Sequence, residues 1–218
     1  MTIRIECLPS GPYLTNTYLL MSSSSDDAVV VDPAHHSTNK INALLQAHGK
    51  VLKAIWITHS HWDHTSDCHE LLAHHNVPVM VHRLDAENLL HPGSDGIPSL
   101  TPLQPIQSLT LLEDKAVVCI GTTSWRVLHT PGHSLGSICF YNAEEGILIS
   151  GDTLFKGTMG NTSFPTSSPY LMGETLLMLC NLPSTTKVFP GHGPSTTIGN
   201  ELSWMAKISK KLREDFSH

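Results

Sequence analysis

The sequence predicts an α/β fold in which two β-sheets pack face to face between outer helices, a four-layer αββα sandwich. Two observations support it: both halves of the chain contain several strand-like apolar runs, and both also contain amphipathic helical segments. A sheet that buries one face against a second sheet needs helices to cover the other face. The 218 residues fit one such domain, which we predict to span 1–218.

The first half is predicted to begin with a hairpin, because a polar run over 22–27 separates two strand-like segments. A helix with apolar residues at helical spacing follows and stops at Gly49. A buried strand then leads directly into His59. In chain order the predicted elements are strands 13–21 and 28–32, helix 37–48, strand 52–58, helix 65–75 and strand 78–82.

The second half is predicted to have the same character after a segment over 85–106 that is rich in Pro, Gly and Ser. Its composition indicates a surface excursion rather than a linker between domains. The elements predicted beyond it are strands 116–121, 125–129, 137–141 and 147–150, helix 171–181, strand 187–189 and helix 200–213.

Composition narrows the class of partner to a small-molecule substrate. A net charge of −6 and a pI near 6.2 argue against nucleic-acid binding. The one dense basic run, 207–213, is spaced like the solvent face of a terminal helix. No stretch approaches the roughly 20 apolar residues that cross a membrane, and no signal peptide is recognisable. Five scattered cysteines without a CxxC pair fit reduced thiols, so a cytoplasmic location is expected.

Fifteen histidines stand out in this composition, and histidine is a common metal ligand. Four of the six residues over 59–64 are of ligand type, which argues against a purely structural role. Alternate residues of an extended segment point the same way, so His59 and His61 can bind one ion. The turn into the next helix can aim Asp63 and His64 at a second point.

Three later segments repeat one pattern, in which a strand ends in a ligand-type residue beside glycine. They are TPGH at 130–133, SGDT at 150–153 and PGHG at 190–193. Glycine permits tight turns and close approach of the backbone to a site. Together with the first run they supply seven ligands, enough for two metal ions with room for water: His59, His61, Asp63, His64, His133, Asp152 and His192.

The order of these four motifs resembles the metallo-β-lactamase superfamily over nearly the whole chain, which implies the αββα fold of that type. Asp32-Pro33 after an apolar strand agrees with it. Within the superfamily, GDTLF at 151–155, Gly160 and PGHGP at 190–194 look like the glyoxalase II-like hydrolases. This branch is expected in a short form, because only residues 193–218 follow His192.

The resemblance also implies a ligand assignment. His59, His61 and His133 would bind one metal ion, and Asp152 would bridge it to a second. The second ion would be bound by Asp63, His64 and His192. Two divalent ions per chain are expected, with zinc favoured by the imidazole and carboxylate ligands and iron or manganese as alternatives.

The implied reaction is hydrolysis of a small thioester by a bridging hydroxide, as in hydroxyacylglutathione hydrolase. Asp63 and Asp152 are the catalytic candidates, Asp152 as the bridge and Asp63 as a carrier of a proton. β-Lactamases of this fold usually place a cysteine among the second-site ligands. No cysteine occupies a matching motif here, so penicillin hydrolysis is not expected.

Glutathione recognition is where the sequence departs from that branch. The family usually has a basic residue directly after the glycine that matches Gly160, and this chain has Asn161. Lys156 lies nearby in sequence, although a solvated surface lysine is the more common role. Trp62 and Phe164 are candidates for the pocket wall.

Three other functions stay open at this point. A persulfide dioxygenase with a single iron would use residues such as His59, His133 and Asp152 and would consume oxygen. A lactone or other ester hydrolase would differ only in its substrates. A non-catalytic metal-binding protein is disfavoured, because every ligand of the motif is present. His129 is a candidate for a residue that hydrogen-bonds to a metal ligand and orients it without binding the metal.

Overall fold

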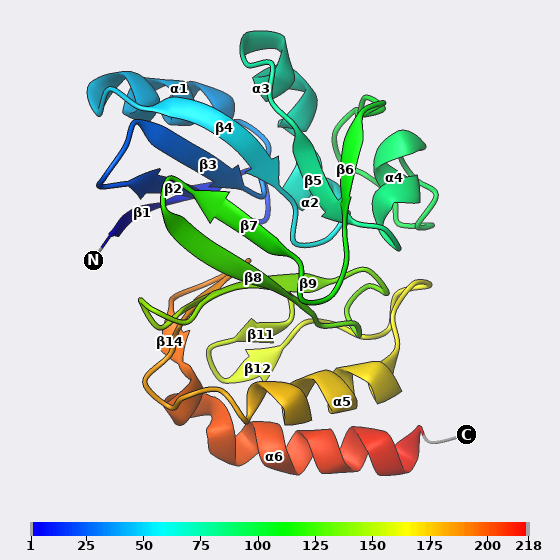
Figure 1. Cartoon of the computed structure of the whole chain (residues 1–218). Coiled ribbons are helices and arrows are strands. Elements are labelled where there is room, and N and C mark those ends of the chain that lie inside the picture. The colour runs from blue at the N-terminus through cyan, green and yellow to red at the C-terminus, as the bar shows by residue number, and fades with distance from the viewer. Residues whose placement is uncertain (1, 217–218) are drawn as a thin grey trace.

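The structure is a computed structural model that describes residues 2–216, so Met1, Ser217 and His218 lie outside the described residues. Two six-stranded sheets pack face to face, and helices cover the outer face of each (Figure 1). The predicted four-layer αββα arrangement is therefore confirmed.

The first sheet contains six strands in the order of the chain, β1 to β6, antiparallel up to β3 and parallel from there on. Apolar residues of α1, α3 and α4 pack on its outer face. The bounds are β1 (Ile3–Ser10), β2 (Thr15–Ser22), β3 (Asp27–Val31), α1 (Thr38–Ala47), β4 (Val51–Trp56), α2 (Trp62–Thr65), α3 (Cys68–His74), β5 (Val79–His82), α4 (Ala86–Leu90) and β6 (Leu109–Leu112).

The second sheet has the order β14-β13-β10-β9-β8-β7 and is covered by α5 and α6, which lie side by side along its outer face (Figure 1). A separate two-stranded ribbon, β11 and β12, precedes α5. The bounds are β7 (Val117–Ile120), β8 (Thr123–His129), β9 (Ile138–Asn142), β10 (Ile147–Gly151), β11 (Leu154–Phe155), β12 (Thr158–Met159), α5 (Pro169–Leu179), β13 (Lys187–Pro190), β14 (Thr196–Thr197) and α6 (Ile198–Asp215).

Aromatic side chains fill the centre of the core between the sheets. Trp56 of the first sheet stacks on Phe140 of the second, with ring centroids 4.7 Å apart, and meets Trp125 edge-on at 5.9 Å. In β3, Val29 faces this inner core while Val30 faces the outer helices, as the alternation of a strand requires. Because the layers hold each other in this way, the loops at the sheet edge start from rigid positions.

Several elements differ from the sequence prediction. The helix α4 inside the 85–106 segment was not predicted, and neither were five strands: β1, β6 and the two-residue strands β11, β12 and β14. The helix predicted over 65–75 is two helices, α2 and α3, separated around Asp67. The Asp67 carboxylate accepts hydrogen bonds from the backbone N–H groups of His36 and Thr38, and this tertiary contact fixes the break.

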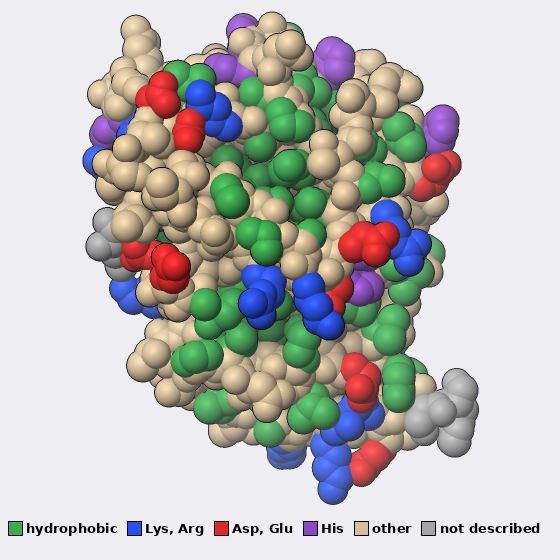
Figure 2. All heavy atoms as spheres, in the orientation of Figure 1, with side chains coloured by type: hydrophobic (Ala, Val, Ile, Leu, Met, Phe, Trp, Pro, Cys, Tyr) green, Lys and Arg blue, Asp and Glu red, His purple; other side chains and the backbone are tan. Residues whose placement is uncertain are grey.

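The distribution of charged side chains on the surface agrees with the acidic composition of the chain. On the face that Figure 2 shows, basic side chains lie in small groups among acidic and apolar ones. Lys207, Lys210 and Lys211 are exposed on α6, as the solvent-face interpretation of the 207–213 run predicts. Within residues 2–216, no helix is both long and apolar enough to span a bilayer.

Candidate metal centre

The seven predicted ligands come together at one edge of the sandwich, on four loops that each follow a strand. The first loop follows β4 and carries the ligands of the 59–64 run. His133 lies between β8 and β9, Asp152 directly follows β10, and His192 follows β13. The pattern of a strand end beside glycine thus marks segments that meet in space, as expected for loops at the ends of neighbouring strands.

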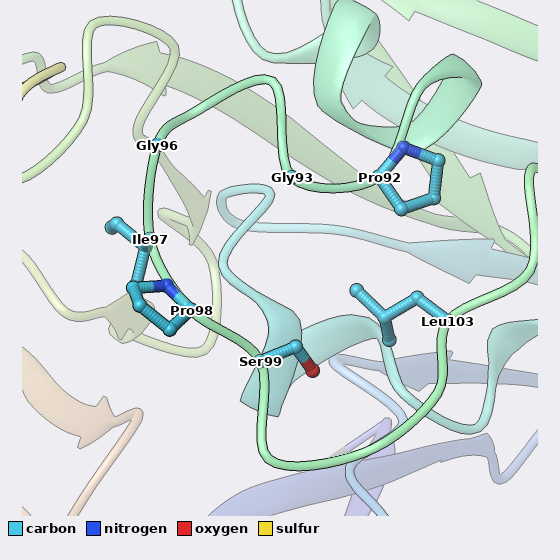
Figure 3. A pocket seen from close by; sticks show the side chains of 7 residues that line it. All are labelled: Pro92, Gly93, Gly96, Ile97, Pro98, Ser99 and Leu103. Carbon is cyan, nitrogen blue, oxygen red and sulfur yellow. The ribbon is translucent and has the colours of Figure 1, made fainter.

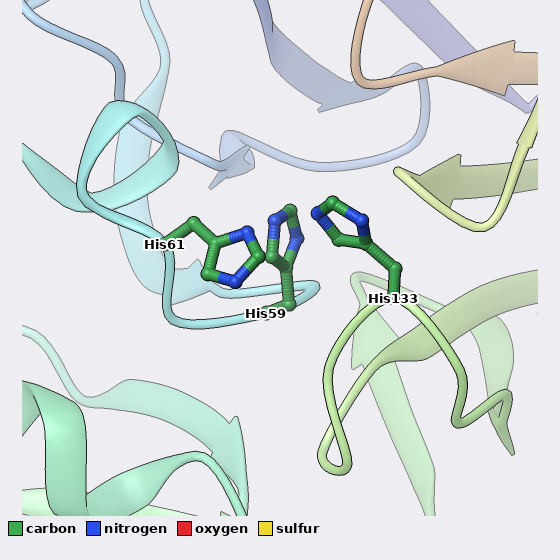
Figure 4. A group of neighbouring side chains, drawn as sticks. All are labelled: His59, His61 and His133. Atoms are coloured by element: carbon green, nitrogen blue, oxygen red, sulfur yellow. The ribbon is translucent and has the colours of Figure 1, made fainter. Parts of the chain in front are cut away.

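His59, His61 and His133 form an all-histidine group. One ring nitrogen from each residue lies within 4.8 Å of the others, and the three rings converge on one point (Figure 4). The ring centroids of this group are 4.5–4.7 Å apart. All three residues are buried. Three imidazoles in this arrangement are a donor set that suits zinc or iron.

Asp63, His64 and His192 form a second group whose potential ligand atoms also lie within 4.8 Å of one another. The Nε2 atoms of His64 and His192 are 3.4 Å and 3.3 Å from the same carboxylate oxygen, Oδ2 of Asp63. This group differs from the first by its carboxylate and by its access to solvent, since the side chain of His192 is 27% exposed.

Asp152 lies between the two groups and reaches both with its carboxylate. Its Oδ2 is 3.5 Å from Nε2 of His133 and 3.4 Å from Nε2 of His192, while Oδ1 is 3.3 Å from Nε2 of His64. Among the described residues, Asp152 is the one carboxylate that lies within 3.5 Å of Nε2 atoms in both groups, as the predicted bridging position requires. Its role as the bridge stays a prediction.

Unbonded buried atoms provide the test of whether these residues fit metal ions. Five potential ligand atoms of the centre are buried and have no hydrogen-bond partner: Nε2 of His59, His61, His64 and His133, and Oδ1 of Asp152. Buried polar atoms without partners are costly and rare in folded proteins. Their concentration at one point, all aimed inward, fits a site built for cations.

The opposite ring nitrogens are held by outer hydrogen bonds, which orient a ligand histidine and select its tautomer. Nδ1 of His64 lies 2.9 Å from Oδ2 of Asp32, and Nδ1 of His133 lies 2.8 Å from the carbonyl oxygen of Asn161. Nδ1 of His192 lies 3.2 Å from the carbonyl oxygen of Tyr13. With Nδ1 donating in each case, Nε2 keeps the lone pair that a metal needs.

Asp32 also lies near His59 and His64, but this third grouping is a hydrogen-bonded support rather than a metal site. The Asp32 carboxylate accepts from the N–H and the hydroxyl of Thr58 and contacts Nδ1 of His64 directly. The prediction that His129 supports the ligands was wrong. Its Nε2 bonds the carbonyl of Leu135 instead.

The two ligand groups also differ in the pKa values of their side chains. Burial, with the neighbouring imidazoles, holds the pKa of His59 well below its usual range. The same causes, burial first and then His133, lower the pKa of His61 to about 3. These two rings are therefore neutral at physiological pH, the form that binds a metal.

The carboxylate-containing group favours positive charge. Burial alone would raise the pKa of Asp63, but the nearby charge of His64 and a hydrogen bond from His192 lower it to about 2. Burial likewise opposes charge on His192, yet its bonds to Asp152 and Asp63 raise the pKa to about 9. The two ionised carboxylates thus attract cations. Without metal ions these cations are the protons bound to His64 and His192, and metal ions would replace those protons.

Glycine beside a ligand has the predicted role at Gly191 and Gly151. A Cβ atom at Gly191 would collide with Oδ1 of Asp152 and approach Cε1 of His64 to 2.7 Å. Gly151 has a φ of +48°, and a Cβ atom there would collide with the side chain of Thr58. A side chain at Gly191 would displace a ligand directly, and one at Gly151 would displace Thr58, whose hydroxyl donates to the Asp32 carboxylate that supports His64.

A cavity of about 410 Å³ opens over the ligands. His61, Asp63, His133, Asp152 and His192 form its floor, whereas His59 and His64 lie beneath it. Its remaining wall is apolar and comes from four separate segments: Tyr13, Trp62, Ile97, Pro98, Leu100 and Phe164. Trp62 and Phe164 thus lie where the sequence analysis suggested.

Asp85 is a structural residue that the sequence analysis missed. Its buried carboxylate accepts hydrogen bonds from the N–H of Ser60, the hydroxyl of Ser134 and the N–H of Gly136. It therefore ties the loop of His59 and His61 to the loop of His133. Its place just after β5 was the available signal, because the other site residues also follow strands.

The chain is similar to known metallo-hydrolases. A family model described as the metallo-beta-lactamase superfamily matches residues 10–192. The chain is 32% identical to the probable metallo-hydrolase YqgX of Bacillus subtilis, over 89% of this chain and 92% of that protein. It is 31% identical to a hydroxyacylglutathione hydrolase of Idiomarina loihiensis, over 80% of this chain and 60% of that protein.

Two solved structures are also similar. The crystal structure of BLEG-1 B3 metallo-beta-lactamase has a TM-score of 0.86 at 32% identity and covers 94% of this chain and 99% of its own. TTHA1623 in a di-iron-bound form has a TM-score of 0.78 at 33% identity, with 91% and 97% covered. The fold, the cluster of histidine and aspartate ligands and the family match agree, and the chain belongs to the metallo-β-lactamase superfamily.

Proposed function

We propose that this chain is a hydrolase that binds two divalent metal ions and cleaves a small thioester. The observation that carries the proposal is the set of unbonded, buried ligand atoms beneath a cavity open to solvent. Family membership supports a metallo-hydrolase, and the similarity to a hydroxyacylglutathione hydrolase supports a thioester as the bond that is cleaved.

We assign one metal ion to each of the two ligand groups. His59, His61 and His133 would hold one ion and Asp63, His64 and His192 the other, with Asp152 between them. Metal ions held in this way lower the pKa of a bound water and polarise a carbonyl oxygen. In the overall reaction, water adds to the acyl carbon, the C–S bond breaks, and the products are a carboxylic acid and a thiol.

The chain's own residues contribute positioning and charge. Asp32 and the carbonyls of Asn161 and Tyr13 hold three imidazole rings in place, so little reorganisation is needed on binding. The hydroxyl of Thr15 donates to Oδ2 of Asp63 at 2.7 Å. With its pKa lowered to about 2, Asp63 is a better ligand than proton carrier, because a general base works best near the ambient pH.

Zinc is the metal that we expect, and iron is the main alternative. Imidazole and carboxylate ligands suit both metals. The similarity to TTHA1623, which was solved in a di-iron-bound form, supports iron. A complete second ligand group favours two ions over the single iron of a persulfide dioxygenase.

A β-lactam hydrolase is the second candidate, favoured by one observation. BLEG-1, a B3 metallo-beta-lactamase, matches nearly the whole chain at 32% identity. The expectation against penicillin hydrolysis, which came from the lack of a matching cysteine, stays untested. Cleavage of an amide needs the same attack on a carbonyl carbon, so β-lactams belong in the substrate panel with thioesters, lactones and other esters.

The experiment is an assay of metal-loaded protein on S-lactoylglutathione, a simple lactone and a chromogenic cephalosporin, with oxygen uptake followed in parallel on a persulfide. We expect thioester cleavage that stops when a chelator removes the metals and returns when they are restored. Faster β-lactam than thioester cleavage would establish the second candidate. Oxygen uptake without hydrolysis would replace both with the dioxygenase.

A further inference from the structure

The wall of the metal cavity is apolar from its floor to its mouth. Phe164 meets His61 edge-on, with ring centroids 5.3 Å apart, and so begins the wall at the ligands themselves. Further out, Tyr13 packs against Trp62 at 5.2 Å. Tyr13 is 56% exposed and Leu100 is 63% exposed, so two large apolar side chains face solvent at the mouth.

No lysine or arginine among residues 2–216 lines this cavity. The charged side chains that do line it are metal-ligand candidates of the floor, Asp63 and Asp152 together with histidines. A substrate portion that carries carboxylates would therefore leave them facing Tyr13, Trp62 and Leu100 without a counter-charge. Desolvating a carboxylate without such a partner is costly.

Lys156 and Asn161, the two residues considered above for contact with glutathione, are both engaged elsewhere. Lys156 is exposed, and the N–H of the next residue, Gly157, donates to Glu201 on α6 at 2.7 Å. Although burial alone would raise the pKa of Glu201, its hydrogen bonds and the charge of Lys156 lower it, which places that lysine beside α6. Asn161 accepts from the N–H of Ser163, so its amide is folded onto its own loop.

From these contacts we infer, on the basis of the proposed hydrolase function, that the substrate presents an uncharged, apolar or aromatic portion to the wall formed by Tyr13, Trp62, Leu100 and Phe164. A thioester of an apolar acyl group with an uncharged thiol fits this wall better than a thioester of glutathione. The cavity volume of about 410 Å³ is within the range of small-molecule sites.

The neighbouring loop leaves room for a longer apolar group. A second cavity, of about 500 Å³, lies inside the curve of the 92–103 segment (Figure 3). It shares Ile97 and Pro98 with the metal cavity, and Leu103 lines its far side. An extended acyl chain that passes Ile97 and Pro98 would therefore meet apolar side chains on both sides of them.

The test is a matrix of four thioesters on metal-loaded protein: lactoyl and phenylacetyl groups, each on glutathione and on N-acetylcysteamine, which is uncharged. We expect kcat/KM for each acyl group to be at least as high on N-acetylcysteamine as on glutathione. Along a series of straight acyl chains on N-acetylcysteamine, we expect kcat/KM to rise by about fourfold for each methylene that becomes buried.

A binding measurement accompanies the assay, so that the inference does not depend on turnover. Titration calorimetry compares the thioethers S-benzyl-N-acetylcysteamine and S-benzylglutathione, which cannot be hydrolysed. We expect the uncharged ligand to bind more tightly.

Variants of Leu100 and Leu111 form a matched pair for the wall. Both leucines are exposed, and Leu111 lies on β6 outside the cavity. Leu100→Lys is expected to raise the preference for glutathione ligands by about twofold to fivefold, the size of an exposed ion pair. Leu111→Lys is expected to leave that preference unchanged.

The outcomes separate the inference from the function on which it rests. Thioester cleavage with a preference of tenfold or more for glutathione, and tighter binding of S-benzylglutathione, would overturn the inference and leave the hydrolase in place. No cleavage but tighter binding of the uncharged thioether would overturn the proposed function and support the apolar wall. No cleavage and no difference in binding would overturn both.

Discussion

Two clusters of histidine in this molecule have opposite character. At the metal centre, five histidines surround two carboxylates, and four of their Nε2 atoms are buried without a partner. Elsewhere, His82 at the end of β5 stacks on His129 at the end of β8, with ring centroids 4.1 Å apart and ring planes inclined by 16°. Both clusters join the two sheets, yet only the first resembles a binding site.

The difference lies in what the ring nitrogens contact. Nε2 of His129 bonds the carbonyl of Leu135, and Nδ1 of His82 accepts from the N–H of Leu84. At the metal centre, by contrast, Asp63 and Asp152 face the Nε2 atoms of His64 and His133, which have no hydrogen-bond partner. Histidines in close contact are therefore not enough to mark a metal site; unbonded nitrogens that face carboxylates are the distinguishing feature.

The largest effect is expected for Asp152→Ala, which removes a carboxylate that lies within 3.5 Å of Nε2 atoms in both ligand groups. We expect kcat/KM to fall by at least about 1,000-fold, together with loss of metal, because the groups at such a centre act as a unit. The matched control is Asp114→Ala at the other cluster, where Asp114 bonds the N–H of His129. Equal metal content in the two variants, measured by elemental analysis, would contradict the comparison.

Gly191→Ala tests whether close approach of the backbone is needed for the ligand geometry. The added Cβ atom would collide with Asp152 and crowd His64. A displacement of about 1 Å at a reacting centre can cost about 100-fold in rate, which is the fall in kcat/KM that we expect. Gly146→Ala is the control, because Gly146 has a φ of +63° but no atom within 4 Å of an added Cβ. Comparable losses in both variants would count against the collision.

Asp32→Asn keeps the shape of the side chain but removes the charge that supports His64. The carboxylate accepts three hydrogen bonds, and an amide nitrogen in its place would face a donor. Outer partners of this type are worth about 10–100-fold in metal affinity or activity. We expect a loss in that range, read from chelator competition, with the far-ultraviolet circular dichroism spectrum unchanged. An affinity equal to that of the wild type would show that His64 does not need this support.

The smallest effect on the metals is expected for His82→Leu, which changes the other cluster. Burial, followed by the nearby His129, lowers the pKa of His82 to about 4. A histidine that is harder to protonate in the folded state than in the unfolded chain, where its pKa is about 6.5, costs stability as the pH falls from 6.5 toward 4.

The Tm of the wild type minus the Tm of His82→Leu is therefore expected to be more positive at pH 7 than at pH 5. The reason is that only the wild type loses stability through protonation of His82 on acidification. Metal content at pH 7 should equal that of the wild type. A constant difference in Tm would show that His82 is not held in its neutral form, and loss of metal would remove the distinction between the clusters.

The clustering of the seven candidate ligands was predictable because each is marked by a local pattern at the end of an apolar strand. The 59–64 run, Asp152 beside Gly151 and His192 beside Gly191 all follow strands that the sequence also predicts. Loops at the ends of neighbouring strands meet in space, so local signals were enough to group residues more than 130 positions apart. The assignment of each ligand to one metal ion stays a prediction.

The remaining features depend on contacts that no local pattern contains. The break between α2 and α3 exists because Asp67 bonds the backbone at His36 and Thr38, far away in sequence. β1 is half-exposed and does not alternate regularly, so its pairing with β2 left no clear period. Tyr13 and Leu100 reach the cavity from irregular loops, whose course is set by tertiary packing. The support of Asp85 for two loops has the same origin.

The most direct test of the account is the metal content of the protein purified without chelators, measured by elemental analysis together with thioester cleavage by the same sample. We predict about two zinc or iron ions per chain, and hydrolysis that is lost along with the metals in Asp152→Ala. Careful purification that yields no bound metal, or cleavage that persists after the metals are removed, would contradict the central claim that this cluster of histidine and aspartate is a catalytic metal centre.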